Sequence, residues 1–165
     1  TGTFNAFTQY GLDSDIIIMA KGIGGGLPLG AIAGNTRVAE VFTYGEHGST
    51  FGGNPVAAAS GLVVMDELEG GLLEKNKVMG ALLLKKLNAI KNKFPDKIKE
   101  VRGLGLMTGA ELFFPGEKVV NELMKHNVLV NCTNENVIRL LPPYIIGEKE
   151  IDMFCDNFEK VLKDF

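Results

Sequence analysis

Residues 15–34 read DIIIMAKGIGGGLPLGAIAG and contain the pattern that decides the fold. Two short apolar runs enclose a tract rich in glycine, and a single cation, Lys21, directly follows the first run. Continuous apolar runs of this length are typical of short buried strands in a parallel sheet. Open α/β sheets place their ligand crevice at the carboxyl ends of such strands. The stretch therefore predicts an α/β fold with a candidate site at Lys21.

The chemistry of this site depends on what Lys21 does beside the glycines. A GxGxxG dinucleotide frame fails, because its sixth position falls on Leu27 or Leu29, and no GK[ST] phosphate loop is present. A lysine partly removed from water has a lowered pKa, so its neutral amine becomes available for Schiff-base chemistry. Glycines would then allow a flat aldehyde cofactor to approach the backbone. The alternative is an exposed lysine in a turn.

A second stretch, residues 47–59, reads HGSTFGGNPVAAA and precedes an expected helix. Asn54 is suited to cap that helix and Pro55 to occupy its first turn. The hydroxyls of Ser49 and Thr50 would lie beside a helix N-terminus, which predicts an anion site built from the dipole and free N–H groups. An N-cap loop with incidental hydroxyls explains the same residues equally well.

The rest of the chain alternates helices and strands. A helix is expected from Asn54 to the glycines at 70 and 71, and a second one within residues 72–94. Met79, Leu83, Leu87, Ile90 and Phe94 recur there at helical spacing and predict one buried stripe. Beyond it we expect strands at 98–103, 106–112, 127–132 and 136–141, and helices at 117–126 and from 148 onward. This mixture predicts a small α+β lobe.

Composition limits the possible partners of the chain. Its 165 residues are 45% hydrophobic, which is enough for a core, and a net charge of -3 gives no reason to expect nucleic acid or an anionic membrane. Apolar runs are too short to cross a bilayer. Cys132 and Cys155 form no disulfide framework, and His47 and His126 lack metal-ligand spacing, so we predict no metal site and a reducing cytoplasmic location. Because the chain begins at Thr1 within an expected turn, we interpret it as a piece of a longer protein.

Four stretches together resemble one family. They are DIIIMAKGIGGGLPLGAIAG, HGSTFGGNPVAAASGLVVMDEL, VRGLGLMTGAEL and VIRLLPPYIIGEKEID, in that order. They are similar to the C-terminal part of class III, ornithine-type aminotransferases, and most closely to the acetylornithine type. The resemblance implies the fold type I of pyridoxal 5'-phosphate (PLP)-dependent transferases, which is aspartate aminotransferase-like. Residues 1–66 would end the large PLP-binding domain, and residues 67–165 would form the small C-terminal α+β domain.

The resemblance also implies roles for individual residues. Lys21 stands where the family attaches PLP covalently and moves a proton between substrate and cofactor. Thr50, with Ser49 beside it, stands where one subunit reaches the cofactor phosphate of the other, which implies a homodimer with shared active sites. Arg139 stands where the small domain handles a substrate carboxylate, directly or by exchange with a glutamate switch, unless it serves an internal salt bridge. Arg102 is interpreted as structural.

The resemblance implies a reaction and an incomplete site. The family's aspartate at the pyridine nitrogen, its main phosphate loop and its ring-stacking aromatic residue lie upstream of this chain, so we expect the piece alone to be inactive or nearly so. The intact protein would transfer an amino group from N-acetylornithine to 2-oxoglutarate in arginine biosynthesis. Ornithine, succinyldiaminopimelate and 4-aminobutyrate transaminases share the motifs and remain alternatives, as does a non-catalytic anion-binding module.

Overall fold

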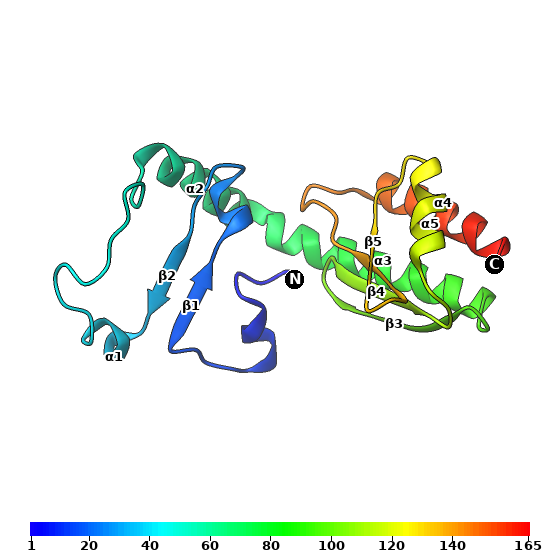
Figure 1. Cartoon of the computed structure of the whole chain (residues 1–165), viewed down its shortest axis with the longest axis horizontal. Coiled ribbons are helices and arrows are strands. Elements are labelled where there is room, and N and C mark those ends of the chain that lie inside the picture. Colours follow the sequence, from blue (N-terminus) through cyan, green and yellow to red (C-terminus); the bar gives the residue numbers. More distant parts are fainter. The chain divides into compact units, whose positions relative to one another are not determined.

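A computed structural model describes all residues from 1 to 165 (Figure 1). The chain forms two compact units. The first unit comprises Asn5–Gly71, and the second comprises Leu72–Phe165 together with Thr1–Phe4. The assignment of residues 1–66 and 67–165 to two domains of a longer enzyme stays a prediction.

The first unit contains a two-stranded sheet and one long helix. Its elements are η1 Ala6–Tyr10, β1 Ile16–Met19, η2 Lys21–Gly24, β2 Ala31–Gly34, α1 Thr36–Ala39 and α2 Pro55–Glu67.

The direction and burial expected for the two strands are wrong. Strands β1 and β2 pair antiparallel, with Ile16 opposite Gly34 and Met19 opposite Ala31. A parallel pair needs a crossover connection, usually a helix, whereas only the single turn η2 lies between these strands. Two strands of four residues leave their faces uncovered, so the side chains of Ile18 and Ile32 are 76% and 64% exposed.

Helix α2 explains part of the glycine tract. Ser60 Oγ on α2 donates a hydrogen bond of 2.9 Å to the carbonyl of Gly24, which is buried. A Cβ at Gly25, where φ is +59°, would lie 2.9 Å from Ser60 Oγ. A Cβ at Gly61 would lie 2.7 Å from Leu29 Cδ2. These glycines are therefore required for close packing of the tract on α2, rather than only for access of a ligand.

The expected limits of α2 are confirmed. Asn54 caps the helix, since its Oδ1 accepts hydrogen bonds from the N–H groups of Val56 and Ala57, and Pro55 occupies the first turn. The helical path continues through η3 Leu68–Leu72 until Gly71, whose φ of 118° departs from helical values. Glycine is the residue that adopts this conformation at least cost.

The second unit is a four-stranded antiparallel sheet with three helices. The strands are β3 Ile98–Leu104, β4 Met107–Leu112, β5 Asn131–Thr133 and β6 Val137–Leu140, in the spatial order β3-β4-β6-β5. The helices are α3 Leu73–Lys93, α4 Glu117–Lys125 and α5 Glu148–Lys163. One face of the sheet contributes Ala110, Leu112 and Ile138 to a core that also contains Leu87 and Phe158 from α3 and α5. The other face carries the polar side chains considered below.

Most expectations for this unit are confirmed. In α3 the side chains of Leu83, Leu87 and Ile90 are buried, and those of Met79 and Phe94 pack against the same core. The strand expected from residue 127 is wrong at its start, because pairing begins only at Asn131.

The residues before Asn131 finish helix α4 instead of extending the strand. Asn127 has a φ of 60°, and the N–H of Val128 bonds back to the carbonyl of Leu123. This is the geometry of a helix C-terminus. Val128 is buried in the core as a consequence.

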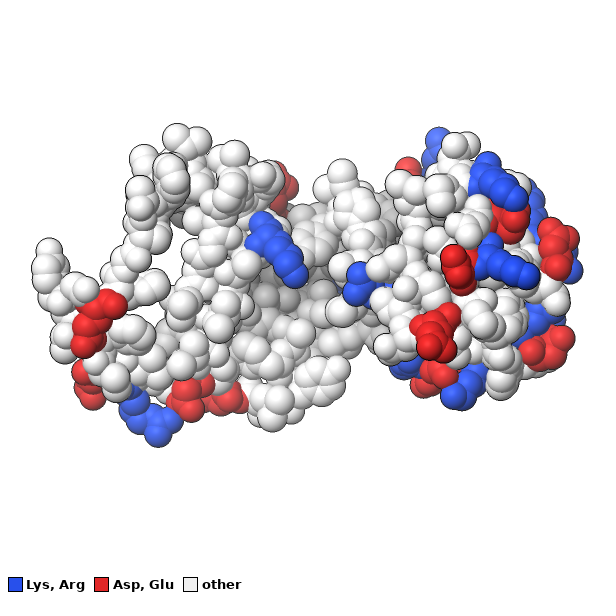
Figure 2. All heavy atoms as spheres, in the orientation of Figure 1, with Lys and Arg blue, Asp and Glu red and all other residues white.

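The charged side chains are distributed unequally. Figure 2 shows Lys, Arg, Asp and Glu crowded over the second unit, whereas most atoms drawn for the first unit are uncharged. Lys21 and Arg37 are the only Lys or Arg residues between positions 5 and 71. No helix combines the length and the apolar character needed to cross a membrane.

Candidate functional site

Lys21 has an unusual backbone conformation. It begins η2 two residues after β1 ends, and its φ is 58°, in the left-handed region that lysine rarely adopts. A non-glycine residue held there costs about 1–3 kcal/mol, and such residues cluster at functional sites. The side chain is exposed, and Nζ makes no hydrogen bond or ion pair. The desolvation expected for Lys21 is therefore absent from this chain, but its primary amine is free to react.

The segment before α2 does not provide the anion site that was expected from the helix N-terminus. Pro55 has no N–H, and the N–H groups of Val56 and Ala57 already donate to Asn54 Oδ1. The next N–H, of Ala58, donates to the Asn54 carbonyl. Because the cap occupies these donors, the expectation of free N–H groups at this helix is wrong.

Polar groups remain available in the loop itself. The side chains of Ser49 and Thr50 are exposed. The backbone N–H groups of Thr50 and Phe51 have no partner in the chain. A Cβ at Gly52 would lie 2.6 Å from Ser49 Oγ, so the serine side chain lies close over the backbone of this turn. Hydroxyls and free N–H groups are suitable donors to a phosphate. No hydrogen bond joins the loop to Lys21.

Arg139 lies on β6 in the second unit. Its neighbours Ile138 and Leu140 point into the core, so Arg139 projects from the opposite face and is exposed. Its Nε donates a hydrogen bond of 3.1 Å to Asn131 Oδ1. No carboxylate of this chain lies within ion-pair distance of the guanidinium, so the alternative of an internal salt bridge finds no partner here.

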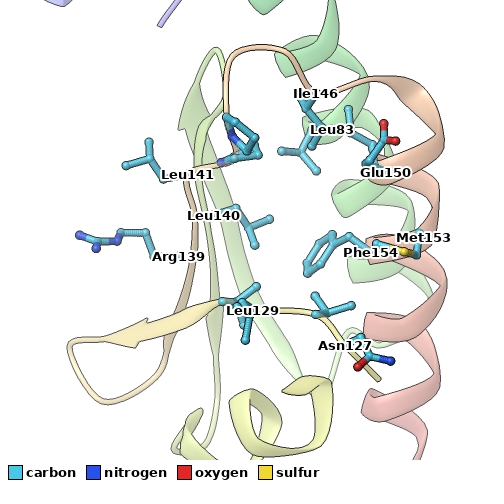
Figure 3. A pocket seen from close by; sticks show the side chains of 15 residues that line it. Leu83, Asn127, Leu129, Arg139, Leu140, Leu141, Ile146, Glu150, Met153 and Phe154 are labelled. Atoms are coloured by element: carbon cyan, nitrogen blue, oxygen red, sulfur yellow. The ribbon is translucent and has the colours of Figure 1, made fainter. Parts of the chain in front are cut away.

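A pocket of about 280 Å3 lies beside Arg139 (Figure 3). Its lining is mainly apolar and comes from α3, α5 and the segments 127–130 and 139–146. The guanidinium of Arg139 points away from α5 in Figure 3, so it does not enter the apolar interior. The pocket and the guanidinium are therefore separate features of this unit.

Arg102 lies on the same face of the sheet as Arg139, but its guanidinium is paired with two carboxylates. Its Nη1 donates to Glu100 Oε2 at 2.7 Å and to Glu111 Oε2 at 2.6 Å. Lys99 Nζ donates to the other oxygen of Glu111 at 2.6 Å. Hydrogen bonds from Lys99 and Arg102 lower the pKa of Glu111, and the bond to Glu111 raises the pKa of Arg102. These contacts support the structural interpretation of Arg102.

The two cysteines are free thiols. Burial raises the pKa of Cys155 to about 11, and Cys132 is half-buried. A thiol with a raised pKa is a poor nucleophile at neutral pH. Cys155 is therefore a core residue rather than a reactive group.

Comparison with known proteins identifies close relatives. The family described as "Aminotransferase class-III" matches residues 1–162. An acetylornithine aminotransferase of Methanocaldococcus jannaschii is 40% identical over 166 residues, covering 99% of this chain and 41% of the relative. The crystal structure of an acetylornithine aminotransferase from Elizabethkingia anophelis superposes with a TM-score of 0.90 at 30% identity, covering 100% of this chain and 43% of that one.

The solved structure of an ornithine aminotransferase is also similar to this chain. The ornithine aminotransferase of Toxoplasma gondii superposes with a TM-score of 0.91 at 29% identity, covering 99% of this chain and 40% of that one. The chain thus spans about two fifths of the length of the proteins it matches.

Proposed function

This chain belongs to the class III aminotransferases, a family that uses PLP, and we propose that it supplies the cofactor lysine and the substrate-carboxylate arginine of an acetylornithine-type transaminase. The observation that carries the proposal is Lys21, a strained residue with a free amine directly after a strand. Strain of this kind persists only where the surrounding structure fixes it, and it is common at active sites.

The residues present fit the chemistry of PLP. An aldehyde requires a primary amine, which Lys21 provides without a competing partner. A phosphate requires hydrogen-bond donors, and the Ser49–Thr50 loop provides two hydroxyls and unpaired N–H groups. When bound, PLP supplies an electron sink that weakens a C–H bond of the amino substrate.

Three sites on this chain would then bind the cofactor aldehyde, its phosphate and the substrate carboxylate. Lys21 Nζ would hold the cofactor and would carry a proton as general base and general acid. Thr50 and Ser49 would hold the phosphate. Arg139 binds a substrate carboxylate through its planar fork, which matches the two oxygens of that group.

A homodimer forms part of the proposal. The hydroxyls of Ser49 and Thr50 and the N–H groups of Thr50 and Phe51 have no partner in the chain, and we propose that they serve the phosphate site of a second subunit. Each active site would then be completed in trans.

The names of the relatives support N-acetylornithine as amino donor, and we propose 2-oxoglutarate as the acceptor that the family resemblance implies. The Methanocaldococcus protein and the Elizabethkingia structure both carry the acetylornithine name. The similarity to the Toxoplasma enzyme keeps ornithine as the alternative donor.

Turnover of the complete enzyme tests the proposal. We expect N-acetylornithine to have a higher kcat/KM than ornithine or 4-aminobutyrate, with 2-oxoglutarate as acceptor. Lys21→Ala should lower kcat by at least about 10³-fold while the dimer persists, because general acid–base catalysis of this kind contributes 10²–10⁴. Full activity of Lys21→Ala would refute the role of Lys21, and a preference for ornithine would reassign the substrate.

A further inference from the structure

One row of residues crosses the open face of the four-stranded sheet. Pairing places Arg102 opposite Gly109, Gly109 opposite Arg139, and Arg139 opposite Asn131. Residues directly opposite each other in antiparallel strands point to the same face. Arg139 therefore has Asn131 on one side, whereas the glycine on its other side contributes no side chain.

Only one nitrogen of the Arg139 guanidinium is hydrogen-bonded within the chain. The hydrogen bond to Asn131 uses Nε, and neither terminal nitrogen has a partner in the chain. An amide oxygen accepts this bond without carrying a charge. The contact thus fixes the plane of the guanidinium without an anionic partner from this chain.

One carboxylate on the same face of the sheet, Glu111, is already occupied. Glu111 lies two residues beyond Gly109 on β4, which is a diagonal position that a long side chain can reach. Its two oxygens accept hydrogen bonds from Lys99 and Arg102, both at 2.6 Å, and its side chain is only 16% exposed. Glu111 therefore does not pair with Arg139 and cannot compete with an incoming carboxylate.

We propose that Asn131 is a positioning residue that holds Arg139 by Nε, while Lys99 and Arg102 occupy Glu111, so that both terminal nitrogens of Arg139 face an incoming substrate carboxylate. This inference rests on the proposed function, in which Arg139 binds that carboxylate. The second unit thus supports Arg139 with the neutral amide of Asn131, while the carboxylate of Glu111 is bound by other cations. An end-on, two-bond contact requires this arrangement.

The test of this proposal changes the charge of the side chain at position 131. Asn131→Asp keeps the shape of the side chain but places an anion on the guanidinium, which then competes with the substrate. Asn131→Ala removes the support without adding a charge. Asn134→Asp is the matched control, since this exposed turn residue undergoes the same chemical change without contact to Arg139.

The complete holoenzyme is assayed for KM and kcat with 2-oxoglutarate, and the cofactor-free protein is titrated with glutarate by calorimetry. Asn131→Asp should raise KM and weaken glutarate binding by about tenfold, with kcat within about twofold, because a close charge pair changes affinity on this scale. Asn131→Ala should raise KM by about threefold, since one orienting hydrogen bond is lost. Asn134→Asp should match the wild type.

Two results overturn the inference. Equal KM values for Asn131→Asp and Asn134→Asp, with Arg139→Ala still weakening glutarate binding, would show that Asn131 has no positioning role although the carboxylate site exists. If Arg139→Ala leaves glutarate binding unchanged, the carboxylate role of Arg139 fails, and the inference about Asn131 fails with it.

Discussion

Replacing Gly80 by alanine should have two opposite effects on the free energy of unfolding. It lies inside α3, where replacing glycine by alanine normally stabilises a helix by about 1 kcal/mol. In this structure a Cβ at Gly80 would lie within 2.5 Å of the Gly105 Cα and would also overlap its carbonyl group. These neighbours are backbone atoms of the turn between β3 and β4, so no flexible side chain can move aside.

The magnitude follows from this contact. Overpacking by one methyl group costs about 1–3 kcal/mol, and contact with rigid backbone places Gly80→Ala at the upper end of that range. After the gain in helix propensity of about 1 kcal/mol is subtracted, we expect a net loss of about 2 kcal/mol. With a urea m-value of about 2 kcal/mol/M, the unfolding midpoint should fall by about 1 M.

Urea unfolding followed by circular dichroism measures this shift. Hydrogen exchange of peptides covering residues 106–112 assigns it to the second unit. Gly70→Ala is the control, because a Cβ at Gly70 would have no neighbour within 4 Å and should leave the midpoint unchanged or raise it. A Gly80→Ala protein as stable as the wild type would refute the close packing of α3 against the turn at Gly105.

Three further outcomes are expected. Thr50→Ala should weaken PLP retention in the complete enzyme, measured by gel filtration and absorbance. A mixed dimer of one Thr50→Ala subunit and one Lys21→Ala subunit should recover activity in one of its two sites. No recovery would contradict the shared site. Cys155, with its pKa raised to about 11 by burial, should resist iodoacetamide at pH 8 until urea unfolds the protein, and rapid labelling of the native state would contradict its burial. The lowered pKa of Glu111 stabilises the folded protein above about pH 4.3, the pKa of an unfolded glutamate, and this stabilisation is lost as the pH falls through the folded pKa. Glu111→Gln should therefore reduce the acid-induced loss of stability, measured by urea titrations at several pH values. An unchanged pH dependence would contradict the ion-pair network of Glu111 with Lys99 and Arg102.

Local signals made the helices predictable. Asn54 and Pro55 define the start of α2 because capping depends on adjacent residues. The apolar spacing in α3 gave its buried stripe, since one face of a helix is determined by a short window of sequence.

The pairing of strands was not predictable to the same degree. The sequence pattern of β1 and β2 suits either direction of pairing, and the antiparallel arrangement follows from the short connection between them. Likewise the N–H groups at the start of α2 are consumed by Asn54, which removes the anion site that a helix dipole alone suggests.

The candidate site was predictable in its residues but not in its contacts. Lys21 and Arg139 are recognisable from motifs, whereas the left-handed backbone of Lys21 and the support of Arg139 by Asn131 are not. The second contact depends on the register of β5 against β6, which involves residues paired across a turn rather than a local pattern. A hairpin turn at residues 134–135, both with positive φ, sets that register.

The most direct test of the role of Lys21 is to locate the cofactor. The complete enzyme is incubated with PLP, reduced with borohydride and analysed by intact mass and peptide mapping, with Lys21→Ala as the control for stray labelling. We predict a single phosphopyridoxyl adduct on the peptide containing Lys21 and none in the variant. An adduct on another lysine, or no adduct on the complete enzyme, would contradict the assignment of Lys21 as the cofactor lysine.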